Sequence, residues 1–221
     1  MTTTPLRKQG TTASAAAPTK GVRRTEPEWA VVVVVVVALV AGWLLKSYVE
    51  GSTVAFTSPE VSLSYPALWL RDVNPDAVTL FGASDMRSGS SYSSNVAVYV
   101  SEALPSLPAG SGQADIEKMT PAITAWSFRR GQELDGFRVL GTEPAQMGGR
   151  VGAMIHYAFV SDPISSPFRK ALPVVVEAAD YLVPLVDKTI ILTVAADGMR
   201  FGEDNSRWFQ PILRSVAFPG N

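Results

Sequence analysis

Residues Trp29 to Leu45 read WAVVVVVVVALVAGWLL, a run of seventeen residues that carries no charge and contains seven consecutive valines. As a helix, this run would span about 25 Å at ~1.5 Å per residue, and adding Ser47 to Val49 brings it near the roughly 30 Å of membrane hydrocarbon. A lone segment in lipid can satisfy its backbone polar groups only as a helix. A valine run also suits a buried β-strand, but seventeen apolar residues far exceed the ~5–6 of a typical strand. The sequence therefore predicts one transmembrane helix over residues 29–49.

The charges on the two sides of this run differ in sign. Residues 1–28 carry five basic and two acidic side chains, whereas residues 50–221 carry 13 basic and 18 acidic side chains. Because positively charged flanks stay in the cytoplasm, we expect residues 1–28 to be a disordered basic cytoplasmic tail. Residues 50–221 would then form a domain outside the cytoplasm, held at the cell membrane by a single-pass signal anchor. The acid-free first 25 residues also fit an organelle transit peptide, which leaves cleavage of this segment open.

The overall composition excludes several classes of protein. The 221 residues have a formal net charge of -1, without the basic excess that nucleic-acid binding requires. The absence of cysteine excludes disulfides, iron–sulfur clusters and thiolate metal sites. The single histidine argues against a histidine-based catalytic triad and against a metal centre built from histidines. We therefore expect no catalytic, cofactor-binding or metal site and no nucleic-acid partner.

Short apolar runs bounded by turn-forming residues predict a β-rich domain after the anchor. The links between them are mostly short, which favours an antiparallel sheet over parallel crossovers. The predicted strands are Val54–Phe56, Val61–Tyr65, Val78–Phe81, Asn95–Ser101, Arg138–Gly141, Val151–Val160, Val174–Leu182 and Thr189–Ala195.

Two segments have helical rather than strand periodicity. In residues 113–130 an apolar stripe recurs every three or four residues, with Pro121 predicting a kink or a late start. Residues 203–217 carry a second stripe, preceded by Asp204, Asn205 and Ser206 as candidate N-caps and interrupted by Pro211. Each stripe needs a sheet face to cover it. The predicted fold is thus α+β, an antiparallel sheet flanked by helices.

Three stretches of this domain resemble a known superfamily. VSLSYPALW (Val61–Trp69), KTIILTVAAD (Lys188–Asp197) and FQPILRSVAF (Phe209–Phe218) are similar to the opening strand, closing strand and closing helix of PsbP-like domains, the PsbP and LpqN-type α/β/α sandwiches. The resemblance covers about residues 54–218 and departs from many relatives at Ala67-Leu68, where a glycine is usual. It implies a sandwich fold and, since most members are binding or assembly factors, a non-enzymatic role.

Isolated polar residues in the predicted strands have ordinary structural explanations. His156, the single histidine, is expected to be a packed or half-exposed strand residue. Glu177 and Asp180 are three apart in one strand, so they should point to opposite faces of the sheet and cannot form a close catalytic pair.

Acidic and glycine-rich turns also lack the pattern of a binding site. Asp197, Glu203 and Asp204 surround a turn without the spacing of a calcium loop. Gly148, Gly149 and Gly152 precede a strand rather than a helix, which predicts a turn and not a phosphate cradle.

The sequence favours a membrane-anchored, non-enzymatic binding or assembly factor that contacts a membrane or envelope protein complex. Phe168, Arg169 and Lys170, in a loop rich in proline and serine, are candidate contacts for an anionic partner or the lipid surface. The loops Arg87–Ser94 and Leu104–Gly112 are further candidate contact regions. The alternative is a small-molecule or lipid carrier with a pocket between sheet and helix, which would be lined by three aromatic side chains: Trp126, Phe128 and Tyr157.

Overall fold

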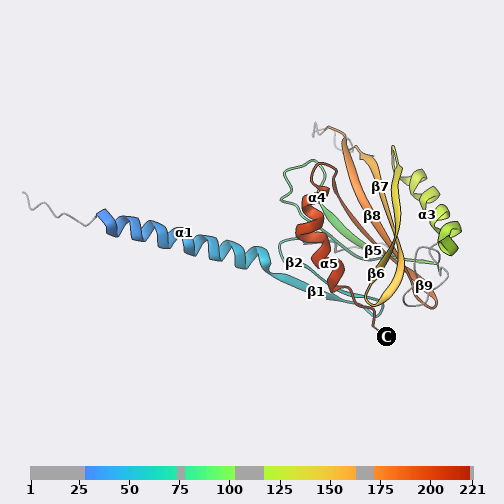
Figure 1. Cartoon of the computed structure of the whole chain (residues 1–221), viewed down its shortest axis with the longest axis horizontal. Helices are drawn as coiled ribbons and strands as arrows, with labels where there is room; N and C mark the ends of the chain where they lie inside the picture. The colour runs from blue at the N-terminus through green and yellow to red at the C-terminus, as the bar shows by residue number, and fades with distance from the viewer. Residues whose placement is uncertain (1–27, 74–77, 103–116, 163–171, 220–221) are drawn as a thin grey trace, which may run out of the picture. The chain divides into compact units, whose positions relative to one another are not determined.

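The computed structural model describes residues 28–73, 78–102, 117–162 and 172–219. The chain divides into two compact units at Leu45 and Lys46, which are described separately. Helix α1 (Glu28–Gly51) contains the valine run and confirms the predicted helix, extending it by one residue at its start and two at its end (Figure 1). By length and composition, Trp29–Gly51 is a candidate membrane span, and it is the one helix of this kind in the described part of the chain.

The second unit is built on two antiparallel sheets. A two-stranded sheet pairs β1 with β2 (Figure 1). A seven-stranded sheet has the order β3-β4-β5-β9-β8-β7-β6. In the large sheet, the meander β3–β5 joins the meander β6–β9 through the antiparallel pairing of β5 with β9. The strands are β1 (Thr53–Thr57), β2 (Ser62–Pro66), β3 (Leu70–Arg71), β4 (Thr79–Ser84), β5 (Asn95–Glu102), β6 (Arg138–Met147), β7 (Arg150–Ser161), β8 (Val174–Pro184) and β9 (Lys188–Asp197).

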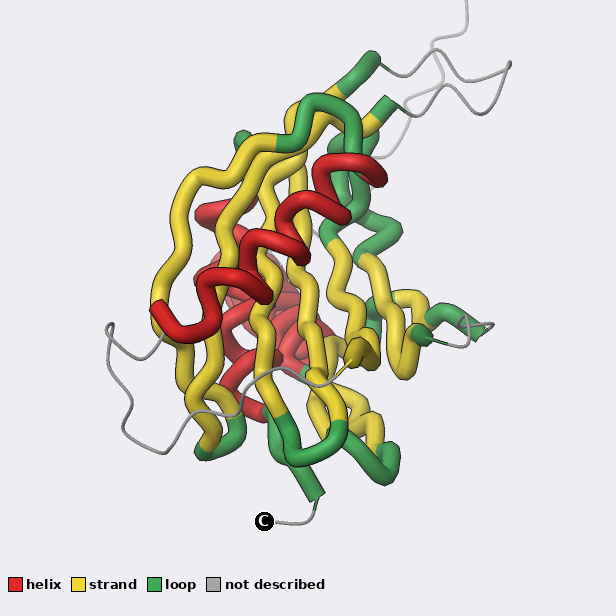
Figure 2. The backbone as a smooth tube through the Cα atoms, turned by 90° about the vertical axis from the view of Figure 1, so that its right-hand side faces the viewer, coloured by secondary structure: helices red, strands yellow, loops and turns green. Residues whose placement is uncertain are grey.

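Helices cover both faces of the large sheet. Helix α3 (Thr120–Glu133) crosses one face, and the C-terminal helical segment lies behind the other (Figure 2). Alternating side chains of the strands supply two separate cores. Ile155 and Tyr157 face α3, whereas Tyr181 and Leu192 belong to the core under the C-terminal segment. This arrangement confirms the predicted α+β fold with an antiparallel sheet flanked by helices.

The β6–β7 hairpin depends on glycine at three positions. Gly148 and Gly149 both have positive φ, 54° and 77°, which is the geometry of the two-residue turns that match strand twist. These glycines therefore form the predicted turn. A Cβ at Gly152 would overlap the backbone carbonyl of Leu182 on β8, so only glycine lets β7 and β8 approach here.

The start of α3 agrees with one of the two outcomes predicted from Pro121. A short 3-10 turn, Glu117–Met119, precedes it, and Pro121 lies in its first turn, where the missing N–H group costs nothing. The proline thus produces a late start rather than a kink. Residues 113–116 of the predicted segment lie outside the described residues.

The C-terminal helical segment begins earlier than predicted and is not regular. It consists of α4 (Phe201–Asp204), a π-helical turn (η2, Asn205–Phe209) and α5 (Gln210–Ser215). Pro211 has no N–H group to donate, and the backbone N–H of Gln210 bonds to the carbonyl of Asn205, so a wider turn accommodates the proline inside the helix.

The predicted N-caps of this segment are therefore wrong. Asp204, Asn205 and Ser206 lie within the helix, and the residue that precedes it is Arg200, which makes no side-chain capping bond. Asp204 is 2% exposed, and its carboxylate accepts a hydrogen bond from the Ser94 hydroxyl. The start at Phe201 was not predicted, because the apolar stripe of this segment is interrupted by Pro211.

Candidate functional site

The site lies between α3 and the large sheet. Met119, Ile123, Trp126 and Arg130 follow one another at spacings of three and four residues and so share the face of α3 that meets the sheet. The first two are buried apolar residues, but the stripe ends in a guanidinium group. A buried cation requires an anion close by.

Asp180 on β8 supplies that anion. It is fully buried, at 0% exposure, and its Oδ2 atom accepts hydrogen bonds from Trp126 Nε1 at 2.9 Å and Arg130 Nε at 3.2 Å. Its Oδ1 atom accepts from Tyr157 Oη at 3.1 Å and from the Thr193 hydroxyl. Four donors from α3, β7 and β9 thus converge on one carboxylate. A buried charge is tolerated when paired and hydrogen-bonded in this way.

The buried charges shift the pKa of their neighbours. Burial lowers the stability of the charged Arg130 guanidinium, but the adjacent Asp180 carboxylate outweighs that effect and raises the pKa of Arg130. Burial, reinforced by the charge of Asp180, raises the pKa of Tyr157. Burial also raises the pKa of Tyr99, whose ring lies 5.8 Å from the Arg130 guanidinium carbon. Arginine therefore stays protonated and these tyrosines stay neutral, a set of groups suited to binding rather than to proton transfer.

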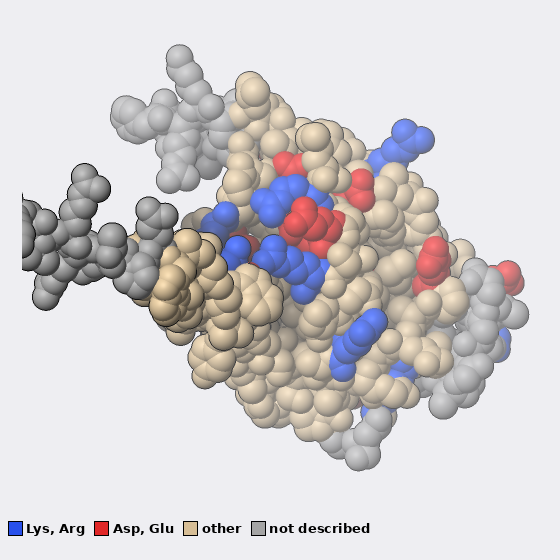
Figure 3. Space-filling model, turned by 60° about the vertical axis from the view of Figure 1, so that its left-hand side comes forward, with Lys and Arg blue, Asp and Glu red and all other residues tan. Residues whose placement is uncertain are grey.

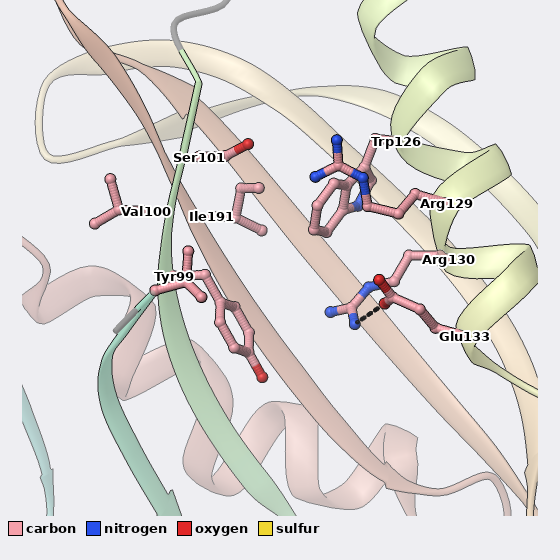
Figure 4. Close-up of a pocket in the computed structure, with 9 residues that line it drawn as sticks. Tyr99, Val100, Ser101, Trp126, Arg129, Arg130, Glu133 and Ile191 are labelled. Carbon is pink, nitrogen blue, oxygen red and sulfur yellow. Dashed lines mark hydrogen bonds and ion pairs between the residues drawn. The ribbon is translucent and has the colours of Figure 1, made fainter. Parts of the chain in front are cut away.

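A cleft of about 190 Å³ opens beside this network. Figure 4 shows side chains of α3 extending over strands β5 and β9, with Arg130 joined to Glu133 by an ion pair of 3.4 Å. The cleft is mostly apolar at its floor and charged at its rim. Its lining consists of Val78, Tyr99, Val100, Ser101, Trp126, Arg129, Arg130, Glu133 and Ile191.

Helix α3 carries a cationic group at the rim of the cleft and an exposed aromatic group on its outer face. Phe128 is 68% exposed, and the Arg129 guanidinium carbon lies 5.9 Å from the centre of the Trp126 ring. A cation over an indole face is a favourable contact that also holds the long side chain in place. Aromatic residues and arginine are the types enriched at protein interfaces.

The aromatic residues predicted for a pocket occupy three different environments. Trp126 lines the cleft, as expected. Phe128 points away from the core into solvent, and Tyr157 lies beneath Asp180 at 2% exposure. Of the three, therefore, only Trp126 contributes to the cleft.

Glu177 and Asp180 point to opposite faces of the sheet, as predicted from their spacing. Asp180 faces α3, whereas Glu177 faces the C-terminal segment, where its carboxylate lies 3.4 Å from His156 Nε2. The His156 ring stacks on Phe201 at 5.4 Å, and its side chain is 31% exposed. This is the half-exposed strand histidine that the sequence predicts.

The remaining candidate residues of the sequence do not join the site. Asp197 accepts a hydrogen bond from the backbone N–H of Met199 and one from the Ser90 hydroxyl, which fastens the loop Arg87–Ser94 to the end of β9. Leu104–Gly112 lies outside the described residues. So do Phe168, Arg169 and Lys170, and their role stays a prediction.

Sequence reasoning missed the pairing of Arg130 with Asp180. The helix continues to Glu133, and Arg130 points from it into the protein. Two signals were present: Arg130 extends the apolar stripe of α3, and Asp180 interrupts an otherwise apolar strand. Together they mark a buried ion pair, but nothing in a single sequence says that the two face each other.

No protein-family model matches the sequence, and no curated protein matches it. The structure is similar to the solution structure of cyanobacterial PsbP from Synechocystis, with 15% identity, coverage of 76% of this chain and 91% of that chain, and a TM-score of 0.48. It is also similar to the Ran-binding protein Mog1p of Saccharomyces cerevisiae, with 10% identity, coverage of 75% and 93%, and a TM-score of 0.45. Both are likenesses of fold, which by themselves say nothing about activity.

Proposed function

We propose that this chain is a single-pass membrane protein whose residues 50–221 form a non-enzymatic binding domain outside the cytoplasm. In this proposal α1 spans the cell membrane, the basic residues 1–28 stay in the cytoplasm, and the domain contacts a membrane or envelope protein complex. The observation that carries the proposal is the exposed surface of α3, where Arg129 lies at the rim of an apolar cleft and Phe128 is exposed on the outer face of the helix.

The size of the cleft supports a protein partner. Pockets for drug-sized ligands measure roughly 300–1,000 Å³, whereas this cleft holds about 190 Å³. It therefore suits one apolar side chain of a partner, with Arg129 providing a contact at its rim and Phe128 a further contact on the outer face of α3. Interface hot spots have this composition: a few aromatic and arginine anchors next to a desolvated pocket.

The chemistry of the network also favours binding over catalysis. Both oxygen atoms of Asp180 already accept hydrogen bonds from two donors each. A carboxylate in this state has no capacity to act as a general base without breaking the packing of α3 on the sheet. Its role is to hold Trp126 and Arg130 in position beneath the exposed surface.

Anchoring makes a modest surface sufficient. A tether confines the domain to a thin layer next to the bilayer and raises its effective concentration toward membrane partners without any new contact. A contact as small as that of Phe128 with Arg129 can then bind a membrane partner, although the same contact would be too weak for a freely diffusing domain.

Site-specific photo-cross-linking tests this proposal. A photoreactive phenylalanine analogue at Phe128 in the full-length chain, activated in native membranes, should give one main adduct with a protein of a membrane or envelope complex. The same analogue at Ser206, on the opposite side of the sheet, should not give that adduct. Identical products from both positions, or none from Phe128, would contradict the proposal.

The loop triplet gives a second, separate test of partner contact. Phe168, Arg169 and Lys170 combine one aromatic and two cationic side chains, the composition expected of a contact with an anionic partner. Replacing all three by alanine should reduce association with the complex or with anionic liposomes. Unchanged association with both would show that these three residues do not contact the partner or the lipid surface.

The apolar lining of the cleft, in contrast to its size, supports a second candidate, a carrier of a small apolar molecule. Its apolar floor at Tyr99, Trp126 and Ile191 would hold such a ligand, and Arg129 at the rim would pair with an anionic group. Native mass spectrometry of the full chain released from mild detergent should then show a bound small molecule. Ser101→Phe, which fills the cleft, should remove that molecule while leaving cross-linking from Phe128 in place. A loss of both would assign the cleft to the protein partner instead.

A further inference from the structure

A second groove lies in the same unit, at the point where the chain leaves the apolar helix. It has a volume of about 240 Å³ and is separate from the cleft beside α3. The last turn of α1, the β1–β2 sheet and the C-terminal helical segment enclose it. Its apolar lining includes Gly51, Pro66, Pro211 and Ile212, and Arg207 and Trp208 lie at its charged end.

Arg207 and Trp208 form a stacked pair in this groove. The Arg207 guanidinium carbon lies 4.5 Å from the centre of the Trp208 ring, and the Trp208 ring meets Trp69 edge-on at 6.5 Å. Trp69 is 4% exposed and belongs to the core. Trp69 thus holds the Trp208 ring in place, and the Trp208 ring in turn holds the Arg207 guanidinium.

Glu50 links this pair to the end of α1. Its Oε2 atom accepts a hydrogen bond from Arg207 Nη2 at 3.2 Å, and its Oε1 atom lies 4.0 Å from Lys46 Nζ. A guanidinium has five N–H donors. Among the described residues, Glu50 is the one acceptor recorded for Arg207, whose side chain is 45% exposed. The guanidinium therefore keeps N–H donors that can bind a second anion.

Charge distinguishes this region from the rest of the domain. Residues 50–221 are acidic overall, but residues 200–215 carry three arginines against two acidic residues, one of which, Asp204, is buried. Figure 3 shows basic and acidic side chains side by side on the face of the domain that is turned toward the viewer. With a net charge of +1, against -5 for residues 50–221 as a whole, this segment is the part of the domain that repels an anionic partner least.

The covalent chain keeps this groove near the bilayer. Leu45 is the last residue of the uncharged run, and Glu50 follows five residues later within the same continuous helix. Five helical residues extend about 7.5 Å at ~1.5 Å each, and even a fully extended chain would reach only about 18 Å. In the continuous helix Glu50 lies about 7.5 Å beyond the end of the uncharged run, so the groove that it lines begins close to the headgroup layer.

From these observations we infer that Arg207 and Trp208 bind the phosphate group of a phospholipid in the membrane that anchors the chain. The guanidinium donates to the phosphate oxygens, and the indole and the apolar groove contact the upper acyl chain, which is the amphipathic environment that tryptophan prefers. This inference rests on the membrane anchoring proposed above. It assigns a lipid-binding role to the C-terminal segment, on the sheet face opposite α3.

The test uses the full chain reconstituted into nanodiscs that contain an anionic phospholipid. A photoreactive phenylalanine analogue at Trp208 should form a phospholipid adduct that mass spectrometry detects, and the same analogue at Phe128 should form none. Arg207→Gln should lower the adduct yield about fivefold, as expected for the loss of one cation at a membrane surface. Arg214→Gln is the matched control, since it removes an exposed arginine of the same segment outside the groove, and it should leave the yield unchanged.

Equal adduct yields at positions 208 and 128, or no effect of Arg207→Gln, would overturn the inference. If the analogue at Trp208 prevents folding, a probe at the exposed Ser206 replaces it, with the same expected dependence on Arg207. Failure of the full chain to enter nanodiscs would instead overturn the membrane anchoring itself. The two failures are therefore distinguishable.

Discussion

Arg130 on α3 and Asp180 on β8 form an ion pair inside the protein, with Nε and Oδ2 3.2 Å apart and side chains 14% and 0% exposed. This pair connects a helix to the middle of a seven-stranded sheet, and it lies directly beneath the surface that we propose as the contact site. Its geometry makes both the stability of the domain and the position of Trp126 depend on the same carboxylate.

Removing one partner of this pair should lower the free energy of unfolding far more than removing both. Asp180→Ala leaves a buried guanidinium without its anion and should lower the free energy of unfolding by about 3–5 kcal/mol, whereas Arg130→Met with Asp180→Leu should cost much less. Chemical denaturation of the full chain in mild detergent measures both. Lys188→Ala, which breaks an ion pair of 3.6 Å with Glu60 near the surface, is the control and should cost less than about 1 kcal/mol. Similar losses for all three variants would contradict this account.

Alkaline pH should destabilise the domain through Tyr157. Burial raises the pKa of this tyrosine above its ordinary value of 10.0, so the folded protein keeps a proton that the unfolded chain loses. The stabilising contribution is complete below about pH 10 and declines as the pH rises further, because the unfolded state then binds fewer protons. Tyr157→Phe should make this decline shallower in denaturation curves recorded against pH. An unchanged slope would show that Tyr157 ionises freely in the folded state.

Gly152 should not tolerate a side chain. A Cβ there would overlap the carbonyl oxygen of Leu182, and relief requires β7 and β8 to separate, so Gly152→Ala should cost about 1–3 kcal/mol or more. Gly141 in the adjacent strand β6 is the matched control, since a Cβ there meets nothing within 4 Å. Thermal unfolding of the two variants should therefore differ clearly. Equal melting temperatures would contradict the packing of β7 on β8.

Phe128 should matter for binding and not for folding. Because its side chain is 68% exposed, Phe128→Ser should change the free energy of unfolding by no more than about 0.5 kcal/mol. The same variant should reduce co-purification of the partner complex from mild detergent. A stable variant that retains the complex in full would remove α3 from the proposed interface.

Much of the fold follows from local sequence patterns. Short apolar runs bounded by turn-forming residues located eight of the nine strands in the described residues, and β3 was missed because two residues are too short a run to be recognised. The seven-stranded order could not be predicted, because the pairing of β5 with β9 joins residues almost a hundred positions apart. The π-helical turn around Pro211 was also hidden, since a proline in an apolar stripe suggests a boundary rather than a wider turn.

The candidate site was less accessible to sequence reasoning. Trp126 was placed correctly beside a cleft because a helical stripe identifies the face that meets the sheet. The ion pair between Arg130 and Asp180 beneath it was not predicted. The spacing of Glu177 and Asp180 shows which face of the sheet each side chain occupies, but it does not show which side chain of α3 lies opposite Asp180. Arg207 gave no signal at all, since its role depends on Glu50, far away in the sequence.

Protease treatment of intact spheroplasts that express the full-length chain is the most direct test of the membrane-anchored, outward-facing domain. The account predicts that protease degrades residues 50–221 without lysis, while an N-terminal tag stays intact and remains with the sedimented membranes. A domain that survives until the cells are lysed, or an intact chain recovered from the aqueous fraction, would contradict it.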